Sequence, residues 1–214
     1  MEKMLQKSQE FRQREEEILK TALDLLLEYG DEKVTVELIA EKVGIGKGTI
    51  YKHFNSKAEI YLRLMIDYER KLSQAINEAI VREKDDGIKG EVARSYLAFR
   101  IQHHEKDHLF QRLEEKLVAF GAVPEMIAEL HSIRSSNLEE LAEIIRVRIN
   151  DGHLEDVNPT YHYLAAWVIA QGAVALNHSK FFEDRITNVE EVMQFIIEIG
   201  VKMGNKGRVS KSES

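Results

Sequence analysis

The sequence GIGKGTIYKHFNSKAEIY, from Gly44 to Tyr61, differs from the rest of the chain in charge and in glycine content. The 214-residue chain has a net charge of −7, yet residues 42–57 contain four lysines and no acidic residue. Three of its glycines fall within five positions, and Thr, Tyr, His and Phe follow them. The local electrostatic field, and not the net charge of the chain, decides whether a phosphate binds. This locally positive stretch therefore predicts a surface that binds a polyanion.

A helix is predicted on each side of the glycine-rich turn. Thr35 is a suitable N-cap for VELIAEKV (residues 36–43), and Gly44 is a suitable C-terminal stop. A short helix of about residues 47–53 follows the turn. Helix, tight turn and short helix form the helix-turn-helix arrangement, in which the second helix enters the major groove of DNA.

DNA recognition of this kind requires a bare backbone and outward-facing polar groups. Gly46 and Gly48 allow the backbone to approach the duplex closely, while Ile45, Ile50 and Phe54 are expected to pack inward. The side chains expected to face DNA are those of Lys47, Thr49, Tyr51, Lys52 and His53, with Lys57 in the first turn of the next helix, where an anion is favoured. The alternative is a helical hairpin with solvated lysines.

The rest of the chain predicts an all-α protein of about nine helices. Ser56 and Glu59 form a capping box for a long helix to about residue 84. Asn158 before Pro159 and Asn188 are further predicted N-caps. The expected organisation is a helix-turn-helix domain at residues 1–57, a helical body at 58–205 and a disordered tail at 206–214.

Composition excludes several classes of site. The chain has no cysteine, which excludes disulfides and thiolate chemistry and fits a cytoplasmic location. Residues 1–17 contain no apolar core, so no signal peptide is predicted. The most apolar run, residues 163–176, is shorter than the about 20 residues that a membrane span needs, so no membrane partner is expected.

The segment from Ile18 to Tyr61 resembles the DNA-binding domain of the TetR family of transcriptional regulators. It contains that family's G-x-x-K-G-T-x-Y-x-H-F-x-x-K run from Gly44 to Lys57. The resemblance covers about 45 residues, and the remaining chain is similar to the family only in helix count and order. It implies a repressor that binds a pseudo-palindromic double-stranded DNA operator as a homodimer and is released by a small-molecule effector.

The resemblance also implies roles for individual residues. Contacts with bases or flanking phosphates are expected for Lys47, Gly48, Thr49 and Lys52. Contacts with phosphates alone are expected for Tyr51, His53, Lys57 and the capping residue Thr35. Two positions depart from the family pattern. Gly46 stands where relatives often have Ser, which removes a capping hydroxyl, and Glu37 stands where some members have a base-contacting Arg.

Small residues in the helix predicted at about residues 159–178 suggest close helix crossing. Together with the last helix, they predict a symmetric dimer contact, which the resemblance also implies. The residues proposed for it are Ala166, Ala170, Ala173, Phe195 and Ile199. The alternative is that these residues pack within a monomeric core.

The middle helices are expected to enclose a mostly apolar effector cavity with a few polar groups. The candidate lining residues are Met65, Tyr68, Tyr96, Phe99, Arg100, His103, Leu113, Leu117, Phe120, Ile127, Arg134, Asn137, Trp167 and Gln171. The alternative for each of them is ordinary core packing.

No catalytic or metal-binding pattern is predicted. The sequence lacks a nucleotide-binding glycine motif, a nucleophile elbow and HExxH. His104 and His108 share a helix face, but a third fixed ligand is missing, so no metal and no cofactor are expected. A second hypothesis for function is a helix-turn-helix protein that responds to a protein partner, or coats DNA, without a small ligand.

Overall fold

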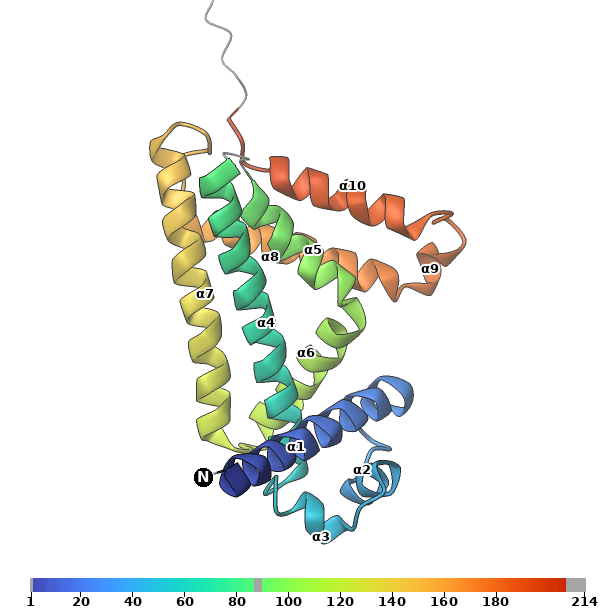
Figure 1. Cartoon of the computed structure of the whole chain (residues 1–214). Coiled ribbons are helices and arrows are strands. Elements are labelled where there is room, and N and C mark those ends of the chain that lie inside the picture. The colour runs from blue at the N-terminus through green and yellow to red at the C-terminus, as the bar shows by residue number, and fades with distance from the viewer. Residues whose placement is uncertain (1, 87–89, 207–214) are drawn as a thin grey trace, which may run out of the picture. The chain divides into compact units, whose positions relative to one another are not determined.

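The computed structural model describes residues 2–86 and 90–206. Ten helices and no strand occur within those residues, so the chain is all-α (Figure 1). The helix beyond the nine expected is α9, whose four residues are too few to show a helical period. The helices are α1 (Glu2–Tyr29), α2 (Val36–Val43), α3 (Lys47–Ile50), α4 (Lys57–Asp86), α5 (Glu91–Gln102), α6 (His104–Ala119), α7 (Pro124–Asn150), α8 (Pro159–Asn177), α9 (Lys180–Glu183) and α10 (Val189–Lys202).

Three of the predicted N-caps are confirmed. The Thr35 hydroxyl accepts a hydrogen bond from the Leu38 amide at 3.1 Å. The Asn158 side chain accepts from the Thr160 amide at 3.0 Å, and that of Asn188 accepts from the Glu191 amide at 3.2 Å. These bonds satisfy amides that have no partner inside their own helices, so local sequence fixes where α2, α8 and α10 begin.

The capping box at the start of α4 is confirmed in one half. The Ser56 hydroxyl accepts from the Glu59 amide at 3.1 Å, as predicted. The Glu59 carboxylate instead accepts from the backbone amide and side-chain amide of Asn55, at 2.7 and 2.8 Å. Glu59 therefore fixes Asn55, the residue before the N-cap Ser56, and so stabilises the turn between α3 and α4.

The chain divides into two compact units. The N-terminal unit comprises Met1–Glu69 and His108–His131, and the C-terminal unit comprises Arg70–Asp107 and Ser132–Ser214. The domain boundaries expected at residues 57 and 205 stay predictions. Of the expected disordered tail, all but Lys206 lies outside the described residues.

Each unit has its own apolar core. In the N-terminal unit, α2 packs against α1, and α3 packs against α2 (Figure 1). The buried apolar residues of these helices and of the turn after α3 include Ile18, Leu26, Ile39, Ile50 and Phe54. In the C-terminal unit, α5 packs against α8 and α10. The core there includes Leu72, Ile76, Tyr96, Leu97, Leu141, Ala170, Ala173 and Ile197.

No helix in the described part of the chain is both long enough and apolar enough to cross a membrane.

Candidate nucleic-acid interface

The turn between α2 and α3 is built from two glycines with different tasks. Gly44 has a φ of 78° and ends α2 in the left-handed conformation, which glycine adopts without strain. Gly46 is the N-cap of α3 and offers no side-chain cap. The Thr49 amide donates to the Gly46 carbonyl at 2.8 Å, so backbone bonding alone starts the helix.

The helix after the turn is shorter than expected. Regular α-helix covers Lys47–Ile50, whereas the sequence predicts about residues 47–53. Beyond Ile50 the chain continues in tighter turns, in which the His53 amide donates to the Ile50 carbonyl at 2.9 Å. Ile50 and Phe54 are buried and fix this segment to the core, as expected.

The outer side of α3 is open. Lys47, Tyr51 and Lys52 are exposed, and Thr49 is half-buried. A Cβ atom added at Gly46 or Gly48 would meet nothing within 4 Å, so among the described residues no side chain beyond the neighbours in sequence fills the space next to these two positions. This arrangement leaves room for a flat or grooved partner to reach the main chain, which is the condition for major-groove docking.

Lys47 forms an ion pair with Glu37 of α2. The two side chains are 49% and 61% exposed, and the Lys47 Nζ also lies 5.7 Å from the centroid of the Tyr51 ring. The hydrogen bond between them lowers the pKa of Glu37 and raises the pKa of Lys47. The pair therefore keeps both charges and joins α2 to the first residue of α3.

Lys57 is occupied within the N-terminal unit. Its Nζ donates to the Val34 carbonyl at 2.9 Å and to the Asp31 carbonyl at 3.3 Å. It also lies 5.4 Å from the centroid of the Tyr61 ring. Two of its three donors thus stabilise the turn before α2. A phosphate contact by Lys57 stays a prediction.

The expectation that His53 projects outward is wrong. Its side chain is 6% exposed, and its ring lies 4.0 Å from the Phe11 ring, centroid to centroid. Glu15 approaches to 3.8 Å from the His53 Nδ1. The reason is the length of α1, which begins at Glu2 instead of near Ile18 and covers this ring. A DNA contact by His53 stays a prediction.

The residues expected to line one effector cavity divide between the two units, and a lining shared by all of them stays a prediction. Phe120 is 83% exposed and Trp167 is 42% exposed, so the expectation that these two line an enclosed cavity is wrong. In the N-terminal unit the set comprises Met65, Tyr68, Leu113, Leu117, Phe120 and Ile127; in the C-terminal unit it comprises Tyr96, Phe99, Arg100, His103, Arg134, Asn137, Trp167 and Gln171.

Several polar members of that set have partners in the core of the C-terminal unit. Arg100 donates to Asp107 at 2.6 Å, and the Gln171 side chain donates to the other Asp107 oxygen at 3.3 Å. Asn137 accepts from the Ser73 hydroxyl at 2.7 Å. These bonds use part of the hydrogen-bonding capacity of these side chains within the unit and so support the fold, while the buried Asn137 Nδ2 has no hydrogen-bond partner among the described residues.

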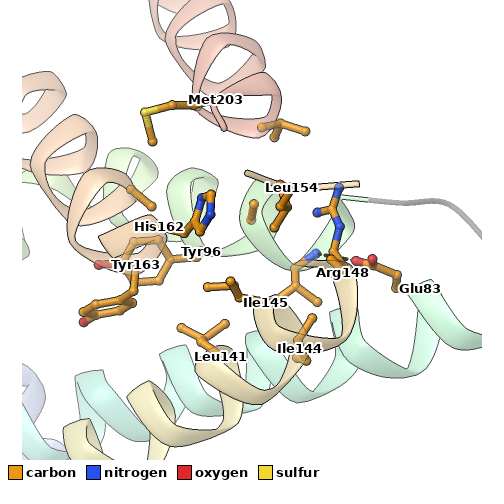
Figure 2. A pocket seen from close by; sticks show the side chains of 15 residues that line it. Glu83, Tyr96, Leu141, Ile144, Ile145, Arg148, Leu154, His162, Tyr163 and Met203 are labelled. Atoms are coloured by element: carbon orange, nitrogen blue, oxygen red, sulfur yellow. Dashed lines mark hydrogen bonds between the residues drawn. The ribbon is translucent and has the colours of Figure 1, made fainter. Parts of the chain in front are cut away.

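A different cavity lies in the C-terminal unit, and Tyr96 is its only lining residue from the predicted set. Its volume is about 80 Å³. Figure 2 shows Tyr96 and Tyr163 on one side and Arg148 with Glu83 on the other, above a floor of Leu141 and Ile144. A more open groove of about 260 Å³ shares Glu83 and Arg148.

The lining residues of this cavity come from α4, α5, α7, α8 and α10, close to the ends of several of these helices. The Glu83 carboxylate is held by the Val92 amide at 3.3 Å, and Arg148 donates to Asn205 at 3.4 Å. Helix periodicity reveals which face of a helix is apolar, but it does not reveal which ends of distant helices meet. The sequence therefore carried no signal for this cavity.

The alanine-rich side of α8 faces inward. Ala170 is 0% exposed, Ala173 is 2% exposed and Ala166 lines the cavity. The predicted dimer contact through Ala170 and Ala173 is therefore wrong, because these residues pack inside their own unit. Phe195 and Ile199 of α10 are 65% and 48% exposed, as a surface contact requires. On α8 the exposed apolar residues are Tyr161, Leu164, Trp167 and Val168.

The histidines near the start of α6 have partners of their own. The His104 Nδ1 lies 3.3 Å from the His178 Nε2. Burial, and then the charge of His178, lower the pKa of His104. His103 stacks on Phe99, with 4.5 Å between the ring centroids. Among the described residues, no group of three or more His, Cys, Asp or Glu side chains is arranged to hold a metal ion.

Comparison with known proteins adds to this geometry. Residues 18–64 match the family model of bacterial regulatory proteins of the tetR family. The uncharacterized HTH-type transcriptional regulator YhgD of Bacillus subtilis is 26% identical over 74% of this chain and 80% of its own length. The nucleoid occlusion factor SlmA of Photobacterium profundum is 38% identical over 34% of this chain, which spans only 37% of SlmA.

A solved structure is similar over nearly the whole chain. It is that of a bacterial regulatory protein in the tetR family from Rhodococcus RHA1. The TM-score is 0.68, with 90% of this chain and 97% of the other covered, at 17% sequence identity. At this identity the likeness concerns the fold.

Proposed function

We propose that this chain, which belongs to the TetR family of bacterial regulatory proteins, represses transcription as a homodimer on pseudo-palindromic DNA. We also propose that a small, mostly apolar effector releases it. Membership of the family makes the chain a DNA-binding transcriptional regulator and not an enzyme. Its place of action is proposed to be the cytoplasm, where bacterial DNA lies.

The open outer side of α3 is the observation that carries the DNA-binding proposal. Lys47, Tyr51 and Lys52 are exposed around a backbone that no side chain covers at Gly46 and Gly48. Thr49 adds a hydroxyl on the same short helix. Cations and hydroxyls next to a bare helix N-terminus suit phosphate and base-edge contacts. A single short helix contacts few base pairs, which favours two copies on a palindrome about 34 Å apart.

The exposed apolar residues of α8 and α10 support the dimer. Leu164 and Val168 lie four residues apart on α8, and they are 47% and 60% exposed. Trp167 lies between them in sequence at 42% exposure, and Phe195 of α10 is 65% exposed. Large apolar side chains left exposed on two helices of one unit are typical of protein contacts. Burying them against a second copy removes about 25 cal/mol of unfavourable free energy per Å².

The cavity of the C-terminal unit supports an effector site. Its floor is apolar, and Arg148 and Glu83 stand at one side (Figure 2). At about 80 Å³ the cavity is small, but the adjoining groove adds about 260 Å³. Together they suit a molecule with a small apolar body and one polar end. A carboxylate end would pair with Arg148.

A second function also has support. SlmA, to which this chain is similar over about a third of its length, is named a nucleoid occlusion factor. The enclosed cavity is well below the about 300 Å³ at which ligand pockets usually begin. A helix-turn-helix protein that is controlled by a protein partner, or that coats DNA, would need no effector cavity.

Selection of bound DNA from a random pool, with the mass of the protein recorded in solution, tests the first proposal. A pseudo-palindrome bound by a dimer is expected. Val168→Glu should give a monomer that has lost the operator, because a charge cannot be buried unpaired in the contact. Val81→Glu is the matched control, since Val81 is also an exposed valine, at 56%, and it lies on α4. A dimer that enriches no sequence would favour coating of DNA and contradict the repressor.

Effector release is tested on the selected duplex with a panel of small aliphatic and aromatic carboxylates. Release by a member of the panel in the wild type, reduced at least tenfold in potency by Arg148→Met, is expected. If a released complex responds equally in both proteins, the effector does not bind through Arg148. If no compound of any class releases the duplex, the second function is favoured.

A further inference from the structure

We propose that Glu37 and Lys47 act as one unit that recognises a single G·C base pair in each half of the operator. This inference rests on the DNA binding proposed above and adds the specificity-determining residue. Glu37 is the second residue of α2, and Lys47 is the first residue of α3. Their ion pair places a hydrogen-bond donor and an acceptor side by side at the start of the helix that enters the groove.

The Glu37–Lys47 pair lies where it can contact DNA while its own ion pair stays intact. Both side chains remain about half exposed or more, at 49% and 61%, so each has hydrogen-bonding capacity facing solvent. The Tyr51 ring, itself exposed, lies with its centroid 5.7 Å from the Lys47 Nζ. The neighbouring positions 46 and 48 have no side chains, and a Cβ added at either would meet nothing within 4 Å, so neither position blocks access to the pair.

The order of polar groups in the major groove selects the base pair. Guanine offers two adjacent acceptors, N7 and O6, and the cytosine amino group beside O6 is a donor. The Lys47 ammonium matches the guanine acceptors, while the Glu37 carboxylate matches the amino group. In an A·T pair the single donor, the adenine amino group, lies between two acceptors, adenine N7 and thymine O4. A carboxylate placed at that donor would also lie next to an acceptor, which repels it.

Charge balance argues against a simple phosphate contact by Lys47. The carboxylate of Glu37 already neutralises the Lys47 ammonium. A phosphate that binds Lys47 would therefore have to displace this carboxylate, which only exchanges one anion for another. A base edge requires no such exchange, because its donor and acceptor groups are satisfied by the intact pair. The pair thus gains from the correct base pair and adds little to binding of DNA in general.

The test is selection from a random duplex pool with full-length wild type, Glu37→Ala and Glu41→Ala. Glu41 is an exposed glutamate one turn further along α2 and serves as the matched control. Wild type and Glu41→Ala should prefer G·C by about tenfold at one position of each half-site. Glu37→Ala should reduce that preference to less than about twofold. Its affinity for unrelated DNA should rise, because Lys47 is then free to bind phosphate.

A base analogue tests the lysine half of the unit. Replacing the selected guanine with 7-deazaguanine removes N7 and should weaken the wild type several-fold, while Lys47→Met should be indifferent to the change. Circular dichroism confirms that each variant is folded. If Glu37→Ala keeps the same G·C preference, or if wild type prefers A·T there, the inference is wrong. If wild type enriches no sequence at all, the DNA-binding proposal itself has failed.

Discussion

The two units of the molecule each contain a short ion pair, and the pairs differ in their exposure to solvent. Lys47 and Glu37 in the N-terminal unit are 49% and 61% exposed, whereas Arg100 and Asp107 in the C-terminal unit are 9% and 1% exposed. A buried charge without a partner costs several kcal/mol, so loss of either member of the buried pair destabilises the fold. An exposed pair contributes little to stability, which leaves its charges available to a ligand.

Glycine shows the same difference between the units. A Cβ at Gly48 would meet nothing within 4 Å, so the absence of a side chain there serves no packing purpose. A Cβ at Gly200 would overlap the Leu97 side chain, where α10 packs against α5. One glycine keeps a surface open, and the other permits two helices to approach. Stability and DNA affinity should therefore respond to different positions.

The largest expected effect on stability comes from the buried ion pair. Asp107→Ala leaves Arg100 buried without its carboxylate and also removes the acceptor of Gln171. We expect a loss of about 3–5 kcal/mol in the free energy of unfolding. Urea denaturation measures it, and Glu37→Ala is the control, with a much smaller expected loss because its ion pair is exposed to solvent. Equal losses in the two variants would remove the distinction between the pairs.

Gly200→Ala should cause the next largest loss of stability. The added methyl forces Leu97 or α10 to move, which in a packed core costs about 1–3 kcal/mol. Gly172→Ala is the matched control, because Gly172 is a helical glycine on α8 whose Cβ would meet nothing within 4 Å. That change should stabilise the chain by up to about 1 kcal/mol through helix propensity. Opposite shifts in thermal midpoint are expected, and a stabilising Gly200→Ala would contradict the close packing.

Features that depend on near neighbours in sequence could be predicted. Thr35, Asn158 and Asn188 cap their helices as expected, because a cap needs only an oxygen two or three residues before an unpaired amide. The open backbone at Gly46 and Gly48 belongs to the same class, since both glycines lie within one turn of helix.

Features that depend on which face of a helix is inside could not be predicted where the helix is apolar all round. On α8, large apolar residues and small ones alternate around the axis, so periodicity does not distinguish the faces. The size of Trp167 predicts a cavity lining and the small size of Ala170 predicts a dimer contact, but Trp167 is 42% exposed and Ala170 is 0% exposed. The outward position predicted for His53 is wrong because residues 2–17 of α1 are mostly polar and show no apolar period, so the sequence does not predict that Phe11 covers this ring.

Gly48→Ala should show most directly that a glycine can keep a surface open for DNA without contributing to packing. Because the position is helical and open, stability should stay the same or rise by up to about 1 kcal/mol. DNA affinity should fall about tenfold, since a methyl group would hold the backbone away from the duplex. Fluorescence anisotropy with the selected duplex measures the affinity. Unchanged affinity would mean that α3 does not approach DNA with this side of its backbone.

The smallest expected effect concerns an ion pair of intermediate exposure in the N-terminal unit. The Lys116 Nζ lies 2.7 Å from the Asp31 carboxylate, with side chains 41% and 14% exposed. Burial of Asp31 acts to raise its pKa, but the hydrogen bond and charge of Lys116, together with a backbone hydrogen bond and the charge of Arg112, lower the pKa overall. The pair should therefore stabilise the fold by about 0.5–1 kcal/mol at neutral pH.

The pH dependence of that contribution has a definite sign. Since the folded-state pKa of Asp31 lies below the unfolded value of about 3.9, the stabilisation is complete above that pH and disappears as pH falls through the folded pKa. The stability difference between wild type and Lys116→Met, followed by urea denaturation from pH 7 to pH 2.5, should shrink accordingly. Lys33→Met changes the same charge at an exposed position in the turn before α2. A difference of the same size and pH profile for Lys33→Met would mean that net charge, and not the contact with Asp31, is responsible.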